Sequence, residues 1–273
     1  MIDIEWRLFE TGSCVHPEIS SREGGSWRPC EFPALVALLR HPRLGWMLFD
    51  TGYGEAFMEA TRRLPERLYR LVTPVRWHPQ QSAAAQLQAR GIEPRLISHV
   101  LLSHLHADHV GSLADFGAAT HWCARAALQD LRGRSRWSAL RKGLLPDLLP
   151  DQPSSRLRHY EDSATVRLPA EFAPFGEGQD VFGDQSVLAV PLPGHAAGHF
   201  GLCFLARERW IFLVGDAAWS RRAIEDNAPP PAWATAMLGD TATYRTTLTS
   251  LHALAGRRTG VVMVPAHCRE ARP

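Results

Sequence analysis

His104-Leu105-His106-Ala107-Asp108-His109 is the stretch around which the chain is organised. It contains three imidazoles and one carboxylate, and both groups are good ligands for a metal such as zinc. If the stretch is extended, alternate side chains share a face, so His104, His106 and Asp108 should converge. His109 should then point elsewhere, toward a second metal. The stretch therefore predicts a metal centre rather than a polar surface turn.

Other metal-type ligands occur at the ends of apolar runs that are predicted to be strands. These runs span 97–102, 186–191, 210–214 and 260–264. The first run leads into the histidine-rich stretch, and the others are followed by His195, Asp216 and His267. One polar residue at a strand end is ordinary, but a repeated pattern of this kind is hard to explain by structure alone. Sheet edges bring distant residues together, so we expect these side chains to form one rigid site.

Composition excludes several classes of protein. With 273 residues, of which 45% are hydrophobic, the chain can form one large domain or two small ones. A charged fraction of 21% and a net charge of +2 indicate neither disorder nor a nucleic-acid surface. No apolar run reaches the length of a membrane span, and the N-terminus lacks the features of a signal peptide. Five scattered cysteines without CxxC spacing favour a reduced, cytoplasmic protein.

The remaining pattern predicts an α/β chain. Residues 1–10 alternate as a strand, followed by a loop to about Pro29, and the runs 33–39 and 46–49 form a predicted hairpin. Residues 54–72 and 80–90 are predicted helices, and 122–150 is rich in helix-forming residues. Strands alternating with helices are typical of α/β architectures.

Five short motifs carry a resemblance to a known family. They are Asp-Thr-Gly at 50–52, HxHxDH at 104–109, Gly-His at 194–195, Gly-Asp at 215–216 and Pro-Ala-His at 265–267. In this order they resemble the metallo-β-lactamase-fold hydrolases, and most closely the N-acyl-homoserine lactonase-like branch. The resemblance implies an α/β (α+β) fold, a four-layer αββα sandwich with metals at one edge. It implies a single domain over 1–273, with a helical insertion near 122–150 that either roofs the active site or packs on the outside.

The resemblance also implies the ligands of two divalent metal ions, most readily Zn, with Fe, Mn or Co as alternatives. One metal takes His104, His106 and His195. The other takes Asp108, His109 and His267, and Asp216 bridges the two. Asp108 is the candidate catalytic residue. Asp50 and His199 are expected behind the ligands, where a carboxylate or an imidazole can orient them.

The implied activity is hydrolysis of a small-molecule ester or lactone by a hydroxide that bridges the metals. A phosphodiesterase or thioester hydrolase is the alternative, because the same metal core serves those reactions. Phosphoryl substrates favour arginines near the site, and Arg221 and Arg222 closely follow the bridging carboxylate. A ligand-binding regulatory protein that retains the metals with weak turnover is the alternative from another class. Neither nucleic acid nor membrane is an expected partner, and the oligomeric state is left open.

Three tryptophans are candidate substrate-binding residues. The lactonases that the chain resembles usually have a tyrosine three residues after the bridging aspartate, where this chain has Trp219. An indole can donate through one N–H but has no hydroxyl. Trp122 and Trp137, in the helix-rich segment, are expected to form an apolar wall for the substrate.

Overall fold

Two β-sheets form the centre of the fold. The structure, a computed structural model, describes residues 2–149 and 156–271. The first sheet has the order β4-β1-β2-β3-β5-β6-β7. Its strands are β1 Glu5–Pro17, β2 Pro29–His41, β3 Gly45–Phe49, β4 Val75–Arg76, β5 Ile97–Leu101, β6 Thr120–Cys123 and β7 Leu157–His159.

The second sheet is formed by the later part of the chain and has the order β13-β12-β11-β10-β9-β8. Most of its neighbouring strands are antiparallel, but β12 and β13 are parallel. Parallel pairing makes these two strands end at the same edge of the sheet. The strands are β8 Ala164–Arg167, β9 Glu177–Asp180, β10 Val187–Pro191, β11 Phe200–Ala206, β12 Arg209–Gly215 and β13 Val262–Pro265.

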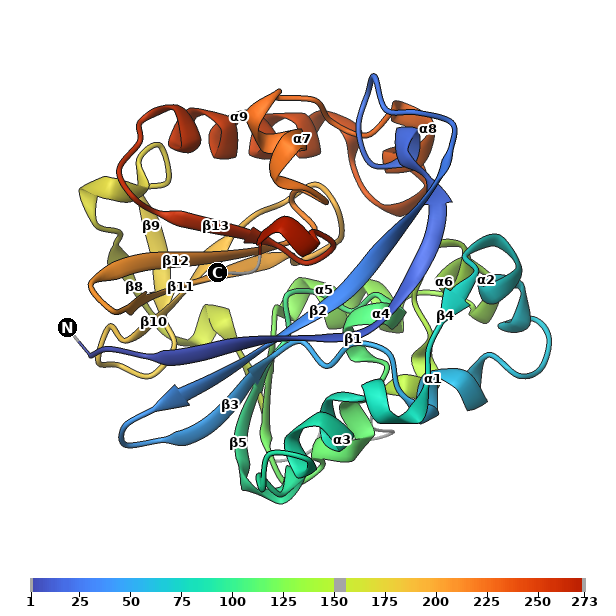
Figure 1. Cartoon of the computed structure of the whole chain (residues 1–273), viewed down its shortest axis with the longest axis horizontal. Helices are drawn as coiled ribbons and strands as arrows, with labels where there is room; N and C mark the ends of the chain where they lie inside the picture. The colour runs from blue at the N-terminus through green and yellow to red at the C-terminus, as the bar shows by residue number, and fades with distance from the viewer. Residues whose placement is uncertain (1, 150–155, 272–273) are drawn as a thin grey trace.

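Helices cover the outer faces of both sheets, so the four layers are αββα as expected (Figure 1). In Figure 1, α7 and α9 lie over the second sheet, whereas α1 and α3 lie on the side of the first. The helices are α1 Glu55–Ala60, α2 Arg67–Val72, α3 Ala83–Gln88, α4 Ala107–Val110, α5 Arg125–Arg132, α6 Arg136–Arg141, α7 Arg221–Glu225, α8 Ala232–Leu238 and α9 Thr241–Gly256. No helix of the described residues is long and apolar enough to cross a membrane.

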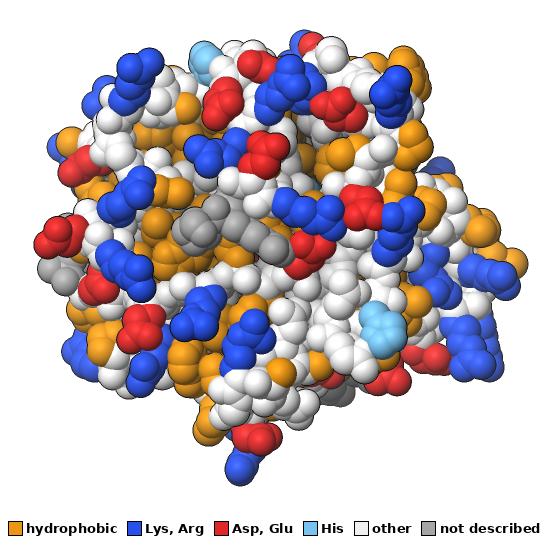
Figure 2. All heavy atoms as spheres, viewed as in Figure 1, with side chains coloured by type: hydrophobic (Ala, Val, Ile, Leu, Met, Phe, Trp, Pro, Cys, Tyr) orange, Lys and Arg blue, Asp and Glu red, His pale blue; other side chains and the backbone are white. Residues whose placement is uncertain are grey.

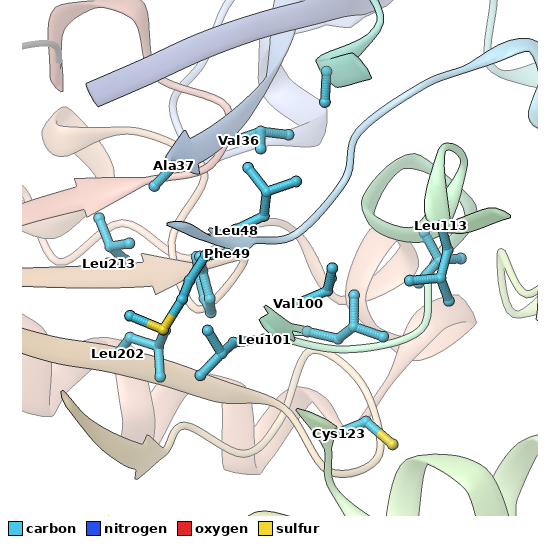
Figure 3. Packing of buried hydrophobic residues seen from close by; sticks show 14 of the residues in the cluster. Val36, Ala37, Leu48, Phe49, Val100, Leu101, Leu113, Cys123, Leu202 and Leu213 are labelled. Atoms are coloured by element: carbon cyan, nitrogen blue, oxygen red, sulfur yellow. The ribbon is translucent and has the colours of Figure 1, made fainter. Parts of the chain in front are cut away.

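The alternation of side chains along each strand explains how the sheets pack. In β12, Ile211 and Leu213 belong to the core cluster shared with the first sheet, whereas Phe212 belongs to the cluster under α7 and α9. Side chains from both sheets, including Phe49, Leu101 and Leu213, gather in the space between them (Figure 3). Burying one such side chain stabilises the fold by about 1.5–3 kcal/mol, so this double-sided burial fixes the strands that carry the site.

Strands were predicted well where the apolar runs are short and bounded. The predicted hairpin is β2 paired with β3, with His41 opposite Gly45, and the four runs before the metal-type ligands are β5, β10, β12 and β13. The loop predicted after residue 10 is wrong, because β1 continues to Pro17. Gly12, with φ of 104°, lies where the register of β1 against β2 shifts, and this irregularity breaks the alternation in the sequence.

Helical segments were predicted less well. Residues 54–72 contain two short helices, α1 and α2, rather than one. The segment 122–150 does not begin as a helix, because Trp122 belongs to strand β6. Its helices are α5, which starts at Arg125, and α6, which starts at Arg136. Its last residue, Pro150, lies outside the described residues. Whether the helical part is an insertion into one domain stays a prediction.

Candidate metal centre

The histidine-rich stretch is a loop that turns into a helix. His106 has extended backbone, with φ of −64° and ψ of 150°, and α4 begins at the next residue. The expected convergence of His104, His106 and Asp108 is therefore wrong, because an extended alternation ends where the helix starts. Asp108 and His109 instead point together toward a different set of ligands.

Two groups of metal-type ligand atoms that share no residue result, and within each group the atoms lie within 4.8 Å of one another. A third group, His104, His109 and Asp216, connects these two. The first group comes from β5, β10 and the loops after them, and the second from α4 and the end of β13. We call them the three-histidine set and the mixed set. The three-histidine set is His104, His106 and His195, and the mixed set is Asp108, His109 and His267.

Asp216 lies between the two sets. Its Oδ2 is 3.2 Å from Nε2 of His195 in the first set and 3.1 Å from Nε2 of His267 in the second. Its Oδ1 is 3.3 Å from Nε2 of His109. One carboxylate thus reaches both sets, which is the geometry that a bridging ligand requires.

The donor atoms fit a pair of divalent metal ions. Nε2 of His104, Nε2 of His109 and Oδ1 of Asp216 are buried and have no hydrogen-bond partner among the described residues. Each buried polar atom left in this state costs about 1–3 kcal/mol, so convergence of several at one point indicates a bound cation. Imidazole nitrogens combined with carboxylate oxygens suit zinc and similar metals.

Asp50 orients one of these ligands. Its Oδ2 is 2.8 Å from Nδ1 of His109, so the imidazole can donate to the carboxylate and direct Nε2 toward the centre. The backbone N–H and the hydroxyl of Ser103 both donate to the same carboxylate at 2.8 Å. Asp50 has φ of 62°, a left-handed conformation that aspartate tolerates better than most residues. Ser103 was not identified from the sequence, because a serine beside the motif carries no metal-ligand signal.

Two other contacts position the ligands from behind. His267 directs Nδ1 to the backbone carbonyl of Pro33 at 2.7 Å, a partner that side-chain patterns cannot show. Nε2 of His199 accepts the backbone N–H of Asp216 at 3.0 Å. His199 is absent from the ligand groups formed by the described residues, and its ring centroid lies 5.0 Å from that of His104. The structure therefore places it where a residue that holds the bridging carboxylate should lie.

Glycines precede two of the ligands for a steric reason. Gly194, before His195, has φ of 124°, and a Cβ there would lie 2.3 Å from the backbone of Tyr244. Gly215, before Asp216, has φ of 52°, and a Cβ there would lie 2.8 Å from Nε2 of His199. Only glycine fits both backbone positions. The Gly-His and Gly-Asp motifs are thus explained by the close packing of the backbone beside the metal ligands.

Burial and the carboxylates divide the histidines into two electrostatic groups. Burial lowers the pKa of His104 and His195 well below the usual range, and it lowers the pKa of His106 to about 4. Burial alone also lowers the pKa of His109 and His267, but their acidic neighbours, led by Asp216, raise it above the value of a free imidazole. The three-histidine set is therefore neutral near pH 7, whereas the mixed set retains protons to higher pH.

Comparison with known proteins agrees with this geometry. The family model described as the metallo-beta-lactamase superfamily matches residues 31–267. The chain belongs to the metallo-β-lactamase superfamily. This membership confirms the predicted fold and the predicted class of metal-dependent hydrolase.

Individual relatives within this superfamily cover nearly the whole chain. The N-acyl homoserine lactonase AttM of Azorhizobium caulinodans is 28% identical over 279 residues, which cover 100% of this chain and 96% of that protein. A structure of N-acyl homoserine lactone hydrolase with its product N-hexanoyl-L-homoserine at the catalytic metal center has a TM-score of 0.72 and 17% identity, covering 99% and 95% of the two chains. The dizinc quorum-quenching lactonase AidC has a TM-score of 0.65 and 14% identity, covering 98% and 89%. These two structures show that the fold is shared.

The three candidate tryptophans occupy different places. Trp219 packs edge-on against the ring of His267, with centroids 5.5 Å apart, and lies 6.3 Å from the ring of His195. It therefore borders both ligand sets. Trp137 lies on α6 and is 58% exposed, so its role in substrate binding stays a prediction.

Trp122 is half-buried and packs against its neighbours in the first sheet, so its role in substrate binding stays a prediction. Its indole N–H donates to Nδ1 of His99, and its ring stacks on Tyr160 and packs edge-on against Phe182. Of these partners Tyr160 is buried, whereas His99 and Phe182 are half-buried like Trp122 itself. Pairing of β6 with β5 brings Trp122 beside His99.

We expect Asp50→Asn to weaken metal binding at the mixed set by about 10–100-fold, because the amide keeps the shape but not the charge that orients His109. Metal content after dialysis against a graded chelator measures this. Asp184→Asn is the matched control, since Asp184 faces His41 at 3.3 Å in another histidine–carboxylate pair outside the centre. Equal metal loss in both variants would contradict an orienting role for Asp50.

We also expect the two metal equivalents to differ in pH dependence. The raised pKa values of His109 and His267 mean that a metal must displace protons there, so affinity for the mixed set should fall as the pH decreases from 8 to 6. The lowered pKa values in the three-histidine set remove this competition in the same range. Calorimetric titration of metal-free protein in buffers of different ionisation enthalpy counts the protons released. Equal proton release by both equivalents would contradict the assignment.

Proposed function

We propose that this chain is a dinuclear metal-dependent hydrolase that opens lactones or related esters, with N-acyl-homoserine lactones as the substrates of first choice. The observation that carries the proposal is the Asp216 carboxylate held between two complete ligand sets. Full-length similarity to a lactonase supports the substrate class. The metals are most readily zinc, which is the metal pair named for the structurally similar AidC.

The chemistry requires little beyond what the centre provides. Two bound metal ions would activate a water molecule and polarise the ester carbonyl. The neutral imidazoles of the three-histidine set leave their metal electron-poor enough to act in this way. No serine or cysteine nucleophile is needed, so the buried, raised-pKa thiol of Cys14 near the centre is not required as a nucleophile.

Asp108 is our candidate for proton transfer. Its side chain is 12% exposed, whereas the side chains of His109, His267 and Asp216 are at most 5% exposed. It is thus the most accessible ligand of the mixed set. Its Oδ2 lies 3.5 Å from Nε2 of His267 and 3.7 Å from Nε2 of His109, so it can hold a proton beside the centre and pass it to the departing alkoxide.

The structure gives less support to phosphoryl substrates. A phosphodiesterase would favour arginines that converge on the metals. Arg221 instead directs its guanidinium to the carbonyl of Glu270 at 3.4 Å, and Arg222 pairs with Asp226 at 3.4 Å. Neither contact involves a metal-set residue.

A substrate panel on metal-replete protein tests the proposal. We expect turnover of acyl-homoserine or simple lactones to exceed that of a phosphodiester, a thioester and a β-lactam. His106→Ala and Asp216→Ala should lower metal content and reduce turnover by at least about 10³-fold, because each removes a ligand. His252→Ala is the control, since its imidazole hydrogen-bonds with the carbonyl of Ile224 at 2.8 Å and belongs to none of the ligand groups found among the described residues. Full activity of metal-free protein would overturn the proposal, and saturable lactone binding without turnover would favour the regulatory alternative.

Trp219 should limit the rate on acyl-homoserine lactones. Its indole N–H is buried without an acceptor among the described residues. An indole has no hydroxyl that could reach the substrate carbonyl. Loss of one such donor typically costs about 10²–10³ in kcat. We therefore expect Trp219→Tyr to raise kcat/KM for these lactones and Trp219→Phe not to. Equal gains in the two variants would show that the bulk of the indole, rather than a missing hydroxyl, limits turnover.

A further inference from the structure

A cavity of about 1270 Å³ lies away from the metal centre and is lined by strands of both sheets. Its walls come from the first residues of β1, the starts of β12 and β13, and the chain after α9. None of the metal ligands lines it. Its arginines are Arg7, Arg90, Arg207, Arg209, Arg221 and Arg258.

The cavity and the metal centre lie at opposite ends of the same strands. Strand β12 starts at Arg209, which lines the cavity, and Asp216 follows its last residue. Seven residues of extended chain separate the two by about 20 Å. Strand β13 likewise starts at the cavity with Val262 and ends before His267. A ligand in the cavity is therefore not a substrate in the metal centre.

The cavity carries more positive charge than the protein neutralises. Among the described parts of the chain, the guanidinium groups of Arg7, Arg207, Arg209 and Arg258 have no hydrogen-bond or ion-pair partner. The lining carboxylates are fewer: Asp3 accepts the backbone N–H of Arg207, Glu5 pairs with Arg40, and Glu225 is the third. Four unpaired guanidinium groups around one hollow favour an anionic ligand.

Two of these arginines occupy strained backbone. Arg207 has φ of 48° and Arg258 has φ of 52°, a left-handed conformation that costs a side chain other than glycine or asparagine about 1–2 kcal/mol. Arg207 and Glu208, with φ of 61°, form the tight turn between β11 and β12. Asparagine or glycine would relieve this turn, so arginine there is not explained by local folding.

The floor of the cavity is apolar. Ile4, Leu38 and Ile211 form it where the sheets meet, and the half-buried rings of Trp6 and Trp46 add to it. Figure 2 shows the face with β1 and β13 in front, where basic side chains surround an area of hydrophobic ones. A fully hydrated small ion would leave this floor in contact with water, whereas a ligand with an apolar body would cover it.

We propose that this cavity binds an amphiphilic anion, with its apolar body on the tryptophan-lined floor and its carboxylate or phosphate head paired with the arginines at the rim. Guanidinium groups bind either head in bidentate fashion. Long-chain carboxylates and phosphorylated amphiphiles both combine an anionic head with an apolar body. The apolar residues of the cavity floor, rather than the metal centre, would select the length of the ligand's apolar chain.

Calorimetric titration of the full-length, metal-loaded protein with dodecanoate, kept below its micellar concentration, tests the site. We expect saturable binding near one equivalent, weaker binding of hexanoate, and no comparable binding of dodecyltrimethylammonium. Dodecyl phosphate compares the two head groups, and binding of either head supports the proposal. The triple variant Arg7→Gln, Arg209→Gln, Arg258→Gln should weaken dodecanoate binding at least tenfold while lactone turnover is unchanged.

Matched variants separate the site from general charge effects. Arg95→Gln, Arg132→Gln, Arg167→Gln removes the same charge from exposed positions outside the cavity and should leave binding intact. Equal weakening in both triple variants would overturn the proposal, as would equal binding of the cationic surfactant. Loss of dodecanoate binding in His106→Ala would place the carboxylate at the metals and also overturn it. Tighter binding of a single-stranded oligonucleotide than of dodecanoate would reassign the cavity to nucleic acid.

Discussion

The buried carboxylate of Asp216 is the constraint on which the rest of the site depends. An ionised carboxylate without partners is very unfavourable in a protein interior, and here three imidazole nitrogens stand within 3.3 Å of it. These imidazoles hold the pKa of Asp216 well below its usual range despite the opposing effect of burial. Each imidazole must in turn be held by a partner of its own, such as Asp50 or the Pro33 carbonyl. The bridging carboxylate, the imidazoles around it and the groups that hold those imidazoles therefore stabilise one another.

The sheets supply the rigidity that such a set needs. Asp216 and His267 follow the parallel pair β12 and β13, whereas His104 follows β5 in the other sheet. Face-to-face packing of the two sheets sets the distance between these strand ends (Figure 3). That packing buries side chains on both faces of each sheet, so small displacements of the strands cost free energy. The ligands at the strand ends are therefore held in a fixed geometry.

Charge is distributed unequally between the two ends of the molecule. Strand β12 leads from an arginine-lined cavity to a carboxylate-bridged centre within one extended segment. The net charge of +2 conceals this separation, since it averages over both ends. The resulting field favours anionic groups at the cavity, while the metal ions that fit the centre would neutralise its acidic side chains. Composition alone therefore describes neither end.

Sequence alone indicated the candidate metal ligands, because imidazoles and carboxylates at strand ends are local features that a single chain displays. It also determined the strands that carry them, such as 97–102 and 210–214, since short apolar runs bounded by turns have few other interpretations. The sequence alone did not show that neighbouring ligands of the HxHxDH motif belong to different ligand sets. Asp108 leaves the His104 and His106 set because α4 begins at Ala107.

Only the tertiary structure decided which residues meet across the sheets. Trp122 was expected to line the substrate site from its apolar character, and only the structure shows that its side chain contacts His99, Tyr160 and Phe182. The support of Ser103 for Asp50, the Pro33 carbonyl behind His267, and the gathering of arginines from distant segments leave no periodic trace in the chain. The reason is physical: chemical type is encoded residue by residue, whereas contacts between distant segments are set by the packing of the two sheets.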